Sequence, residues 1–216
     1  MHIADGIMAP ELWIAGWILA LIGLGLMFWK LGKRLDERTM PMMAILAAGI
    51  FVAQMLNFPI GGGTTGHLIG AALATILLGP YAAMLIITAI LTIQCLVFGD
   101  GGITSLGLNI LNMAIIAPLV TYGVMMLFGK NRTLGTPVAA WAAVFIAATV
   151  CAAQLALSYS ISDGTYGITG ALAFPAMMGY HALIGVGEAI VTTGVVLFLA
   201  KVSPEMLELN LKPAGA

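Results

Sequence analysis

Charged residues are scarce in this sequence of 216 residues, in which Lys, Arg, Asp and Glu together make up 8% of the chain. A soluble domain carries about a quarter charged residues, because its surface has to be hydrated. Apolar residues instead make up 61% of the chain, and the mean hydropathy is +1.08. Long apolar runs recur from one end to the other, each near the ~20 residues that a helix needs to cross a bilayer. The composition excludes a soluble domain and predicts a polytopic membrane protein.

Several other features are missing, and each absence excludes a class of function. The formal net charge is −1, which does not suit a nucleic-acid binder. The two cysteines, Cys95 and Cys151, lie far apart within apolar runs, so we expect buried thiols without a disulfide framework or a CxxC metal site. No P-loop and no HExxH pattern occurs, so the chain alone is not expected to hydrolyse ATP, and nothing supports an intramembrane enzyme.

The apolar runs predict an all-α bundle of seven transmembrane helices in a single domain, residues 1–216. Within that domain we expect an external N-terminus (1–7), whose chemistry is described below, the helix bundle (8–200) and a cytoplasmic tail (201–216). The expected spans are Met8–Trp29, Pro41–Phe58, Gly66–Leu78, Tyr81–Phe98, Leu108–Phe128, Pro137–Ser158 and Met178–Ala200.

Two readings of Gly79-Pro80 fit the local pattern, namely a tight reversal between two helices or a kink in one long helix. The basic residues favour the reversal. With seven helices and the N-terminus outside, all eight Lys and Arg fall on the cytoplasmic side, as the positive-inside rule prefers. With six helices, the early and late basic residues would lie on opposite sides. Residues Met1–Glu11 have no basic region typical of a signal peptide, so we expect Met1 itself to be displayed outside.

Strongly polar side chains concentrate in the outer half of the predicted bundle, and they are Gln54, Asn57, Gln94, Asn109, Asn112, Gln154 and His181. Glu188 follows His181 by seven residues on nearly the same helix face and lies about 10 Å deeper. Such groups are costly in a membrane and usually face a cavity or one another. The pattern predicts a polar binding cavity that opens to the outside, above an apolar inner half. For the amides, His181 and Glu188, a structural role between helices is favoured over direct ligand contact.

The first two residues offer a divalent metal three nitrogens. The Met1 amine and the His2 amide nitrogen would close a five-membered chelate ring, and the same amide nitrogen and His2 Nδ1 would close a six-membered ring. One equatorial position stays open, and His67, in a glycine-rich loop on the same outer face, is placed to fill it. Four nitrogens in a plane suit Ni(II) or Cu(II), and they also accept Co(II). Because the amide proton is displaced, binding should depend on pH.

Four segments of the sequence resemble the CbiM and NikM substrate-binding subunits, the S components of energy-coupling factor transporters for cobalt and nickel. The N-terminal Met1-His2-Ile3-Ala4-Asp5-Gly6 is the most specific, and segments 62–70, 98–109 and 181–189 add to it. The likeness extends from residue 1 to about 200.

The resemblance implies a seven-helix fold that binds Co²⁺ or Ni²⁺ as transported substrate, without an organic cofactor. It implies Met1, His2 and His67 as ligands, with Asp100 in an external loop that closes over them. We expect four further residues either beside the site or in contact with the loop that closes it, namely Asn109, Asn112, His181 and Glu188. It also implies separate partners in the prokaryotic inner membrane: a coupling subunit, two ATP-binding cassette ATPases and a small accessory membrane subunit. A metal sensor or chaperone that does not transport is the alternative, and an intramembrane enzyme a more distant one.

Overall fold

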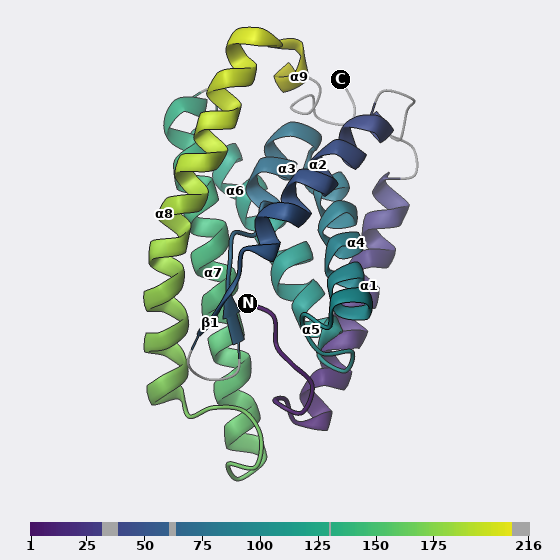
Figure 1. The fold of residues 1–216 in the computed structure, drawn as a ribbon, viewed down its shortest axis with the longest axis vertical. Helices are drawn as coiled ribbons and strands as arrows, with labels where there is room; N and C mark the ends of the chain where they lie inside the picture. The colour runs from purple at the N-terminus through teal and green to yellow at the C-terminus, as the bar shows by residue number, and fades with distance from the viewer. Residues whose placement is uncertain (32–38, 61–63, 130, 209–216) are drawn as a thin grey trace.

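The computed structural model describes residues 1–31, 39–60, 64–129 and 131–208, which are mostly helical (Figure 1). The helices are α1 (Pro10–Leu31), α2 (Thr39–Met55), α3 (Ala71–Leu78), α4 (Pro80–Phe98), α5 (Leu106–Asn109), the π-helix η1 (Ile110–Ile116), α6 (Ala117–Phe128), α7 (Arg132–Ile161), α8 (Gly170–Val202) and α9 (Glu205–Glu208). Two short antiparallel strands, β1 (Phe58–Ile60) and β2 (Thr64–Gly66), form a hairpin.

Among the described residues, five helical segments are long and apolar enough to cross a membrane, namely α1, α4, the continuous helix 106–128, α7 and α8. They make the chain a multi-pass membrane protein, as its composition predicts. Helix α2 has 17 residues, and α3 has only 8, which corresponds to about 12 Å of rise against a hydrocarbon core of about 30 Å. The prediction that every one of seven helices spans the bilayer is therefore not established by helix length.

The long helices run side by side, with α7 and α8 forming an extensively packed antiparallel pair (Figure 1). The last turn of α1, the first turn of α7 and the last turn of α8 carry Lys30, Arg132 and Lys201 and lie at the same end of the molecule. Arg132 also donates from Nη1 to the carbonyl oxygen of Leu207 over 3.1 Å. The other basic residues of the orientation argument lie outside the described residues, and they are Lys33, Arg34, Arg38, Lys130 and Lys212.

The segment after β2 corrects the sequence prediction of a helix over Gly66–Leu78. Residues 64–66 are a strand, and helix α3 begins only at Ala71, because Gly70 has φ +73°, a left-handed conformation outside the helical region. The hairpin also adds a small β element to the predicted all-α fold. After α3, Gly79 has φ 80° and ψ 166°, and α4 starts at Pro80 and packs against α3. The structure thus confirms two separate helices at Gly79-Pro80.

The helix over 106–128 widens into π-helical geometry in its middle, directly before Ala117-Pro118. Pro118 has no N–H and cannot donate to the carbonyl of Ala114, so the regular hydrogen-bond ladder is interrupted there. π-Helical turns occur often at functional sites. This one carries Asn112 and directly follows Asn109.

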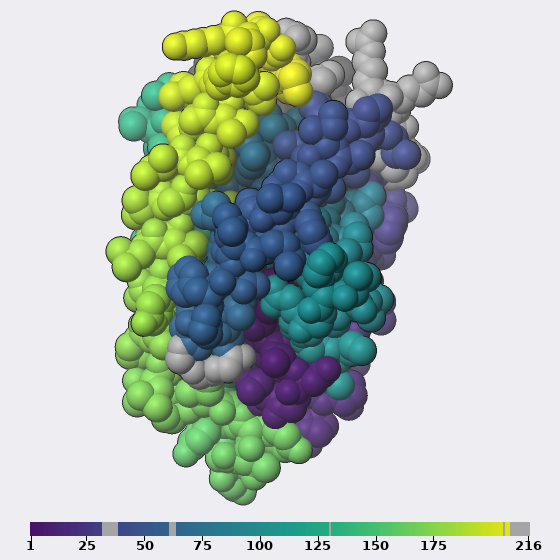
Figure 2. Space-filling view, viewed as in Figure 1, coloured from purple at the N-terminus to yellow at the C-terminus, as the bar shows by residue number. Residues whose placement is uncertain are grey.

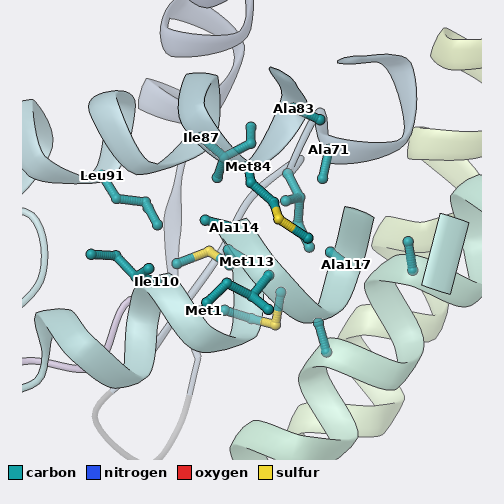
Figure 3. Packing of buried hydrophobic residues seen from close by; sticks show 14 of the residues in the cluster. Met1, Ala71, Ala83, Met84, Ile87, Leu91, Ile110, Met113, Ala114 and Ala117 are labelled. Carbon is teal, nitrogen blue, oxygen red and sulfur yellow. The ribbon is translucent and has the colours of Figure 1, made fainter. Parts of the chain in front are cut away.

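The core contains the first residue of the chain. Met1 belongs to the buried apolar cluster together with Met113 and Ile110 of η1 and Met84 of α4 (Figure 3). Both cysteines are buried free thiols, as predicted. By contrast, α1 leaves large apolar side chains such as Leu21 and Ile22 exposed, which suits a lipid-facing helix.

Candidate metal site at the amino terminus

The chain begins inside the molecule and runs outward to α1 (Figure 1). Met1, His2 and Ile3 are 0%, 3% and 0% exposed. Ile3 is fixed at both of its backbone polar groups: its N–H donates to Asn109 Oδ1 over 2.9 Å, and its carbonyl oxygen accepts from Gly102 N over 2.9 Å. Asn109 Nδ2 also donates to the Ile3 carbonyl oxygen over 3.2 Å. Asn109, predicted beside the site, therefore anchors the N-terminal segment.

Asp5 fastens the exposed part of the N-terminal segment to the loop after α4. Its carboxylate accepts from the backbone N–H groups of Ile103 and Thr104 over 3.0 and 2.8 Å. The loop approaches this segment closely, because a Cβ added to Gly102 would overlap the backbone nitrogen of Asp5. The exposed residues 4–6 thus cover the buried ones, and Figure 2 shows these purple residues between the blue and teal segments.

The other side of the N-terminal segment is held by the last turn of α7 and by the loop that follows it. Ala9 N donates to Ser158 Oγ over 2.8 Å, and Gly167 N donates to the Ile7 carbonyl oxygen over 2.7 Å. Elements from three parts of the chain therefore fix the position of the first nine residues, and with it the position of the α-amino group.

The α-amino group of Met1 meets β2 and the residue that follows it. Its nitrogen donates to the carbonyl oxygen of Thr65 and lies 3.1 Å from His67 Nε2. His67 Nδ1 lies 2.7 Å from the carbonyl oxygen of Leu68. Because a carbonyl oxygen only accepts, the proton of a neutral His67 belongs on Nδ1. The lone pair of Nε2 consequently points toward the Met1 amine.

His2 lies between Thr65, His67 and the loop after α4. Its backbone N–H donates to Thr65 Oγ1 over 3.3 Å, and its ring stacks on that of His67 with 4.5 Å between centroids and 20° between planes. Its Nδ1 lies 2.9 Å from Asp100 Oδ1, and Asp100 Oδ2 accepts from Asn57 Nδ2 over 2.6 Å. The loop residue Asp100 therefore contacts the same ring nitrogen that would close a six-membered chelate.

Burial keeps the nitrogens of this cluster uncharged near neutral pH. It lowers the pKa of the Met1 amine from 8.0 to about 5, it lowers the pKa of His2, and it lowers that of His67 well below 6.5. For Asp100, burial alone raises the pKa, but its hydrogen bond and charge interaction with His2 leave that pKa below 3.8. Unprotonated nitrogens next to an ionised carboxylate favour a divalent cation over a proton.

In the described part of the chain, no group of three or more His, Cys, Asp or Glu side chains is arranged to hold a metal ion. The N-terminal cluster instead brings together an amine, an amide and two imidazoles from the backbone and the side chains of Met1, His2 and His67. The stacked rings of His2 and His67 show that a planar arrangement of all four donors requires the His2 ring to turn.

The remaining predicted residues lie around this cluster rather than in it. Glu188 of α8 accepts from Ile69 N over 2.8 Å and from Gly70 N over 2.6 Å, so it holds the backbone that follows His67. His181 contacts its own helix, with Nδ1 2.8 Å from the Met177 carbonyl oxygen. Asn112 exchanges two 2.8 Å hydrogen bonds with Gln154 of α7 and thereby ties η1 to α7.

Thr65 is the clearest residue that sequence reasoning missed, since it contacts both the amine and the amide. No local signal identified it, because the sequence from Gly66 onward was expected to be helical and β2 ends at Gly66. Asp5 was quoted only as part of a motif, although it fixes the loop that carries Asp100. Neither its bond to Thr104 nor that to Ile103 is visible in a local pattern.

This combination of apolar spanning helices with a buried N-terminal nitrogen cluster defines a multi-pass membrane protein with a candidate cation site. The chain matches the CbiM family, described as "Cobalt uptake substrate-specific transmembrane region", over residues 2–206. The chain therefore belongs to the CbiM family, which confirms the resemblance seen in the sequence.

Relatives and solved structures agree with this membership. The putative fused nickel transport protein NikMN of Archaeoglobus fulgidus is 43% identical over 99% of this chain and 70% of its own length. A solved structure of a truncated transition metal transporter is 37% identical, covers 94% of this chain and 99% of its own, and superposes with a TM-score of 0.88. The S component of a bacterial ECF transporter shares the fold at a TM-score of 0.59, with 19% identity over 78% of this chain and 98% of that one.

Proposed function

We propose that this chain is the substrate-capture subunit of an ATP-driven energy-coupling factor importer of nickel or cobalt ions. The observation that carries the proposal is the 3.1 Å approach of the Met1 amine to His67 Nε2, within a buried cluster that also contains His2. Family membership and the nickel transport name of the Archaeoglobus relative support the choice of ions.

In this proposal the substrate ion is bound by the Met1 amine, the His2 amide nitrogen, His2 Nδ1 and His67 Nε2. The first three atoms belong to adjacent residues and form fused five- and six-membered chelate rings, while His67 supplies the fourth donor. Nitrogen donors in a plane favour Ni(II), and they also accept Co(II), so selection between the two depends on geometry and availability. Thr65 and Asp100 then exchange their present contacts with the amide and the ring for contacts with the bound complex.

The buried position of the donors implies that capture and release need a conformational change. The segments that have to move are the N-terminal residues and the loop 100–104, because the Asp5 carboxylate binds one to the other. We propose that separate partners drive release, namely a membrane coupling subunit, two ATP-binding cassette ATPases and a small accessory membrane subunit. The S-component fold supports this assignment.

We further propose seven membrane segments in the prokaryotic inner membrane, with the N-terminus outside and the C-terminus in the cytoplasm. Helix α3 reaches through only part of the bilayer, and the hairpin and residues 67–70 complete its path on the outer side. The shared position of Lys30, Arg132 and Lys201 at one end supports a cytoplasmic assignment of that end.

Two linked experiments test the function. Elemental analysis and competition titration of the purified chain should find one nickel or cobalt ion per protein, with protons released on binding. Uptake of radioactive nickel by cells should then require co-expression of the ATPases and the coupling subunit. Binding without uptake in that complete system would instead indicate a sensor or chaperone, and failure to bind either ion would remove the proposal.

A further inference from the structure

Gln94, near the end of α4, is a buried amide that the ligand set leaves unexplained. Its side chain is 0% exposed, and neither Oε1 nor Nε2 has a well-formed hydrogen bond to the described residues. A buried amide without partners is costly, and an apolar side chain of similar size avoids that cost. We therefore expect the Gln94 side chain to form its hydrogen bonds in another conformational state of the protein.

The position of Gln94 next to Asp100 suggests what that function is. The backbone N–H of Asp100 donates to the Gln94 carbonyl oxygen over 2.9 Å, so both side chains arise from the turn that ends α4. Asp100 reaches His2 Nδ1 from this turn at 2.9 Å, and the Gln94 side chain lies against the same imidazole. Two potential hydrogen-bond acceptors of different strength, the Asp100 carboxylate and the Gln94 amide oxygen, thus lie beside the His2 imidazole.

A neutral imidazole carries its proton on one nitrogen only. The carboxylate of Asp100 only accepts, and it lies 2.9 Å from Nδ1 without a well-directed hydrogen bond, so its charge favours the tautomer with the proton on Nδ1, which then cannot coordinate a metal. For Nδ1 to coordinate, the proton has to lie on Nε2. Histidines that bind metals almost always donate their other N–H to an acceptor, which fixes the tautomer and the ring orientation.

We propose that Gln94 is the positioning residue for His2, accepting a hydrogen bond from Nε2–H through Oε1 and so freeing Nδ1 for the chelate. Asp100 and Gln94 then stabilise opposite tautomers of one ring, without any change in its charge: Asp100 the closed, metal-free one and Gln94 the coordinating one. This inference rests on the proposed function only in taking His2 Nδ1 as a ligand.

The tautomer can be measured without metal, by nitrogen NMR of the ¹⁵N-histidine-labelled protein in detergent. Only three histidines occur, and a His181→Gln variant assists their assignment. His2 should carry its proton on Nδ1 in the wild type and on Nε2 in Asp100→Ala. Adding Gln94→Met to Asp100→Ala should abolish that preference for Nε2, because methionine fills the space but accepts no comparable hydrogen bond. Unchanged His2 signals in Asp100→Ala, or an Nε2–H preference that persists in the double variant, would overturn the inference.

Nickel affinity provides the second measurement. Gln94→Met should weaken nickel binding by about tenfold or more, the usual effect of removing a hydrogen-bond partner of a ligand. Gln94→Glu should restore most of the affinity and shift metal-free His2 toward Nε2–H, which tests the idea even if Gln94→Met folds poorly. The matched control is Gln154→Met, because Gln154 bonds to Asn112 and should affect stability alone.

Equal losses of affinity in Gln94→Met and Gln154→Met, with the same His2 tautomer in Asp100→Ala and in the Asp100→Ala, Gln94→Met double variant, would reduce Gln94 to a packing residue. This test of Gln94 can be distinguished from the test of the proposed metal ligands. Full nickel affinity in His67→Ala would refute the ligand assignment, whereas the metal-free tautomer would still report whether Asp100 and Gln94 compete for His2.

Discussion

The α-amino nitrogen of Met1 lies 3.1 Å from Nε2 of His67, although 66 positions separate the two residues. This contact exists only because the chain returns its first residues to the interior and fastens them with bonds to the loop after α4 and to the α7–α8 connection. The candidate site is therefore a product of the whole fold, while its donors are mostly those of two adjacent residues. Changes at the start of the chain should consequently affect metal binding far more than stability.

Replacing His67 removes the donor that comes from outside the N-terminal segment. We expect His67→Ala to weaken nickel binding by well over tenfold, because a chelate of three nitrogens loses its fourth equatorial donor and gains no substitute of similar strength. Competition titration measures the affinity, and size-exclusion chromatography in detergent reports whether the fold persists. Wild-type affinity in a folded His67→Ala protein would exclude the residue from the site.

The docking of the N-terminal segment should depend on pH even without metal. The pKa of the Met1 amine is about 5 in the folded chain and 8.0 when exposed. Between these values the undocked segment binds more protons than the docked one, so docking becomes more favourable as the pH rises from 5 to 8 and is lost on acidification. The lowered pKa of His67 acts in the same direction.

Amide hydrogen exchange at Ile3, measured across this pH range and corrected for the intrinsic rate, reports the docking equilibrium. Protection should increase toward pH 8, and Asp5→Asn, which weakens the bonds to Ile103 and Thr104, should lower it at every pH. Protection that instead increases toward pH 5 would contradict the assignment of an uncharged amine.

The long helices could be predicted from local patterns, because each is a continuous apolar run. The proximity of His2 and His67 was predicted by placing both residues on the outer side of the membrane. The ligand roles themselves stay predictions. The extent of α3 was wrong because its start depends on distant partners. Residues 66–70 look apolar enough to be helical, but Glu188, which is 119 positions after Ile69, binds the free N–H groups of Ile69 and Gly70.

The contact between Asp100 and His2 was equally hidden, since the expectation of a closing loop came from family resemblance and named no partner. Hydrogen bonds across about 100 positions are set by tertiary packing, which periodicity does not encode. The unpaired amide of Gln94 is a further case, because the sequence predicts a position near the outer end of a helix but does not indicate which side chain Gln94 contacts.

Glu188 should stabilise the site from outside the ligand set. Its two carboxylate oxygens accept from two backbone N–H groups, whereas glutamine has one acceptor oxygen. Glu188→Gln should therefore lose about 1–3 kcal/mol of stability yet keep near-normal nickel affinity once folded, and Glu188→Leu should lower the melting temperature and expression further. Thermal unfolding and titration separate the two effects. Loss of the nickel absorption band in a folded Glu188→Gln protein would make the residue a ligand.

Membrane orientation can be tested independently of metal. Reporters fused after Arg38, Arg132 or Ala216 should be cytoplasmic, because the basic residues cluster near these points. Reporters inserted near Gly102 or Gly164 should be external, since these loops flank the N-terminal segment. Cysteine labelling with an impermeant reagent gives the same information without a large fusion. Gly102 and Arg132 on the same side of the membrane would refute the seven-segment arrangement.

The strongest prediction concerns the first atom of the chain. One glycine added before Met1 turns the amine into an amide and moves the new amine to a position where it cannot close the five-membered ring with the His2 amide nitrogen. Because Met1 is fully buried beside Thr65 and His67, the extra residue also has no space in the docked segment. We expect nickel uptake to be abolished and binding to be strongly weakened, while the helices still insert and fold; acetylation of the amine should act alike by removing its lone pair. A tag after Ala216 serves as the matched control and should be tolerated. Acetylation of the unextended amine is the sharper probe, because a glycine-extended chain places the histidine third and itself offers nickel an amine, two amide nitrogens and an imidazole. Mass spectrometry has to establish the first residue in each sample, and full-affinity binding by a verified acetylated protein would leave the amine without a role in the site.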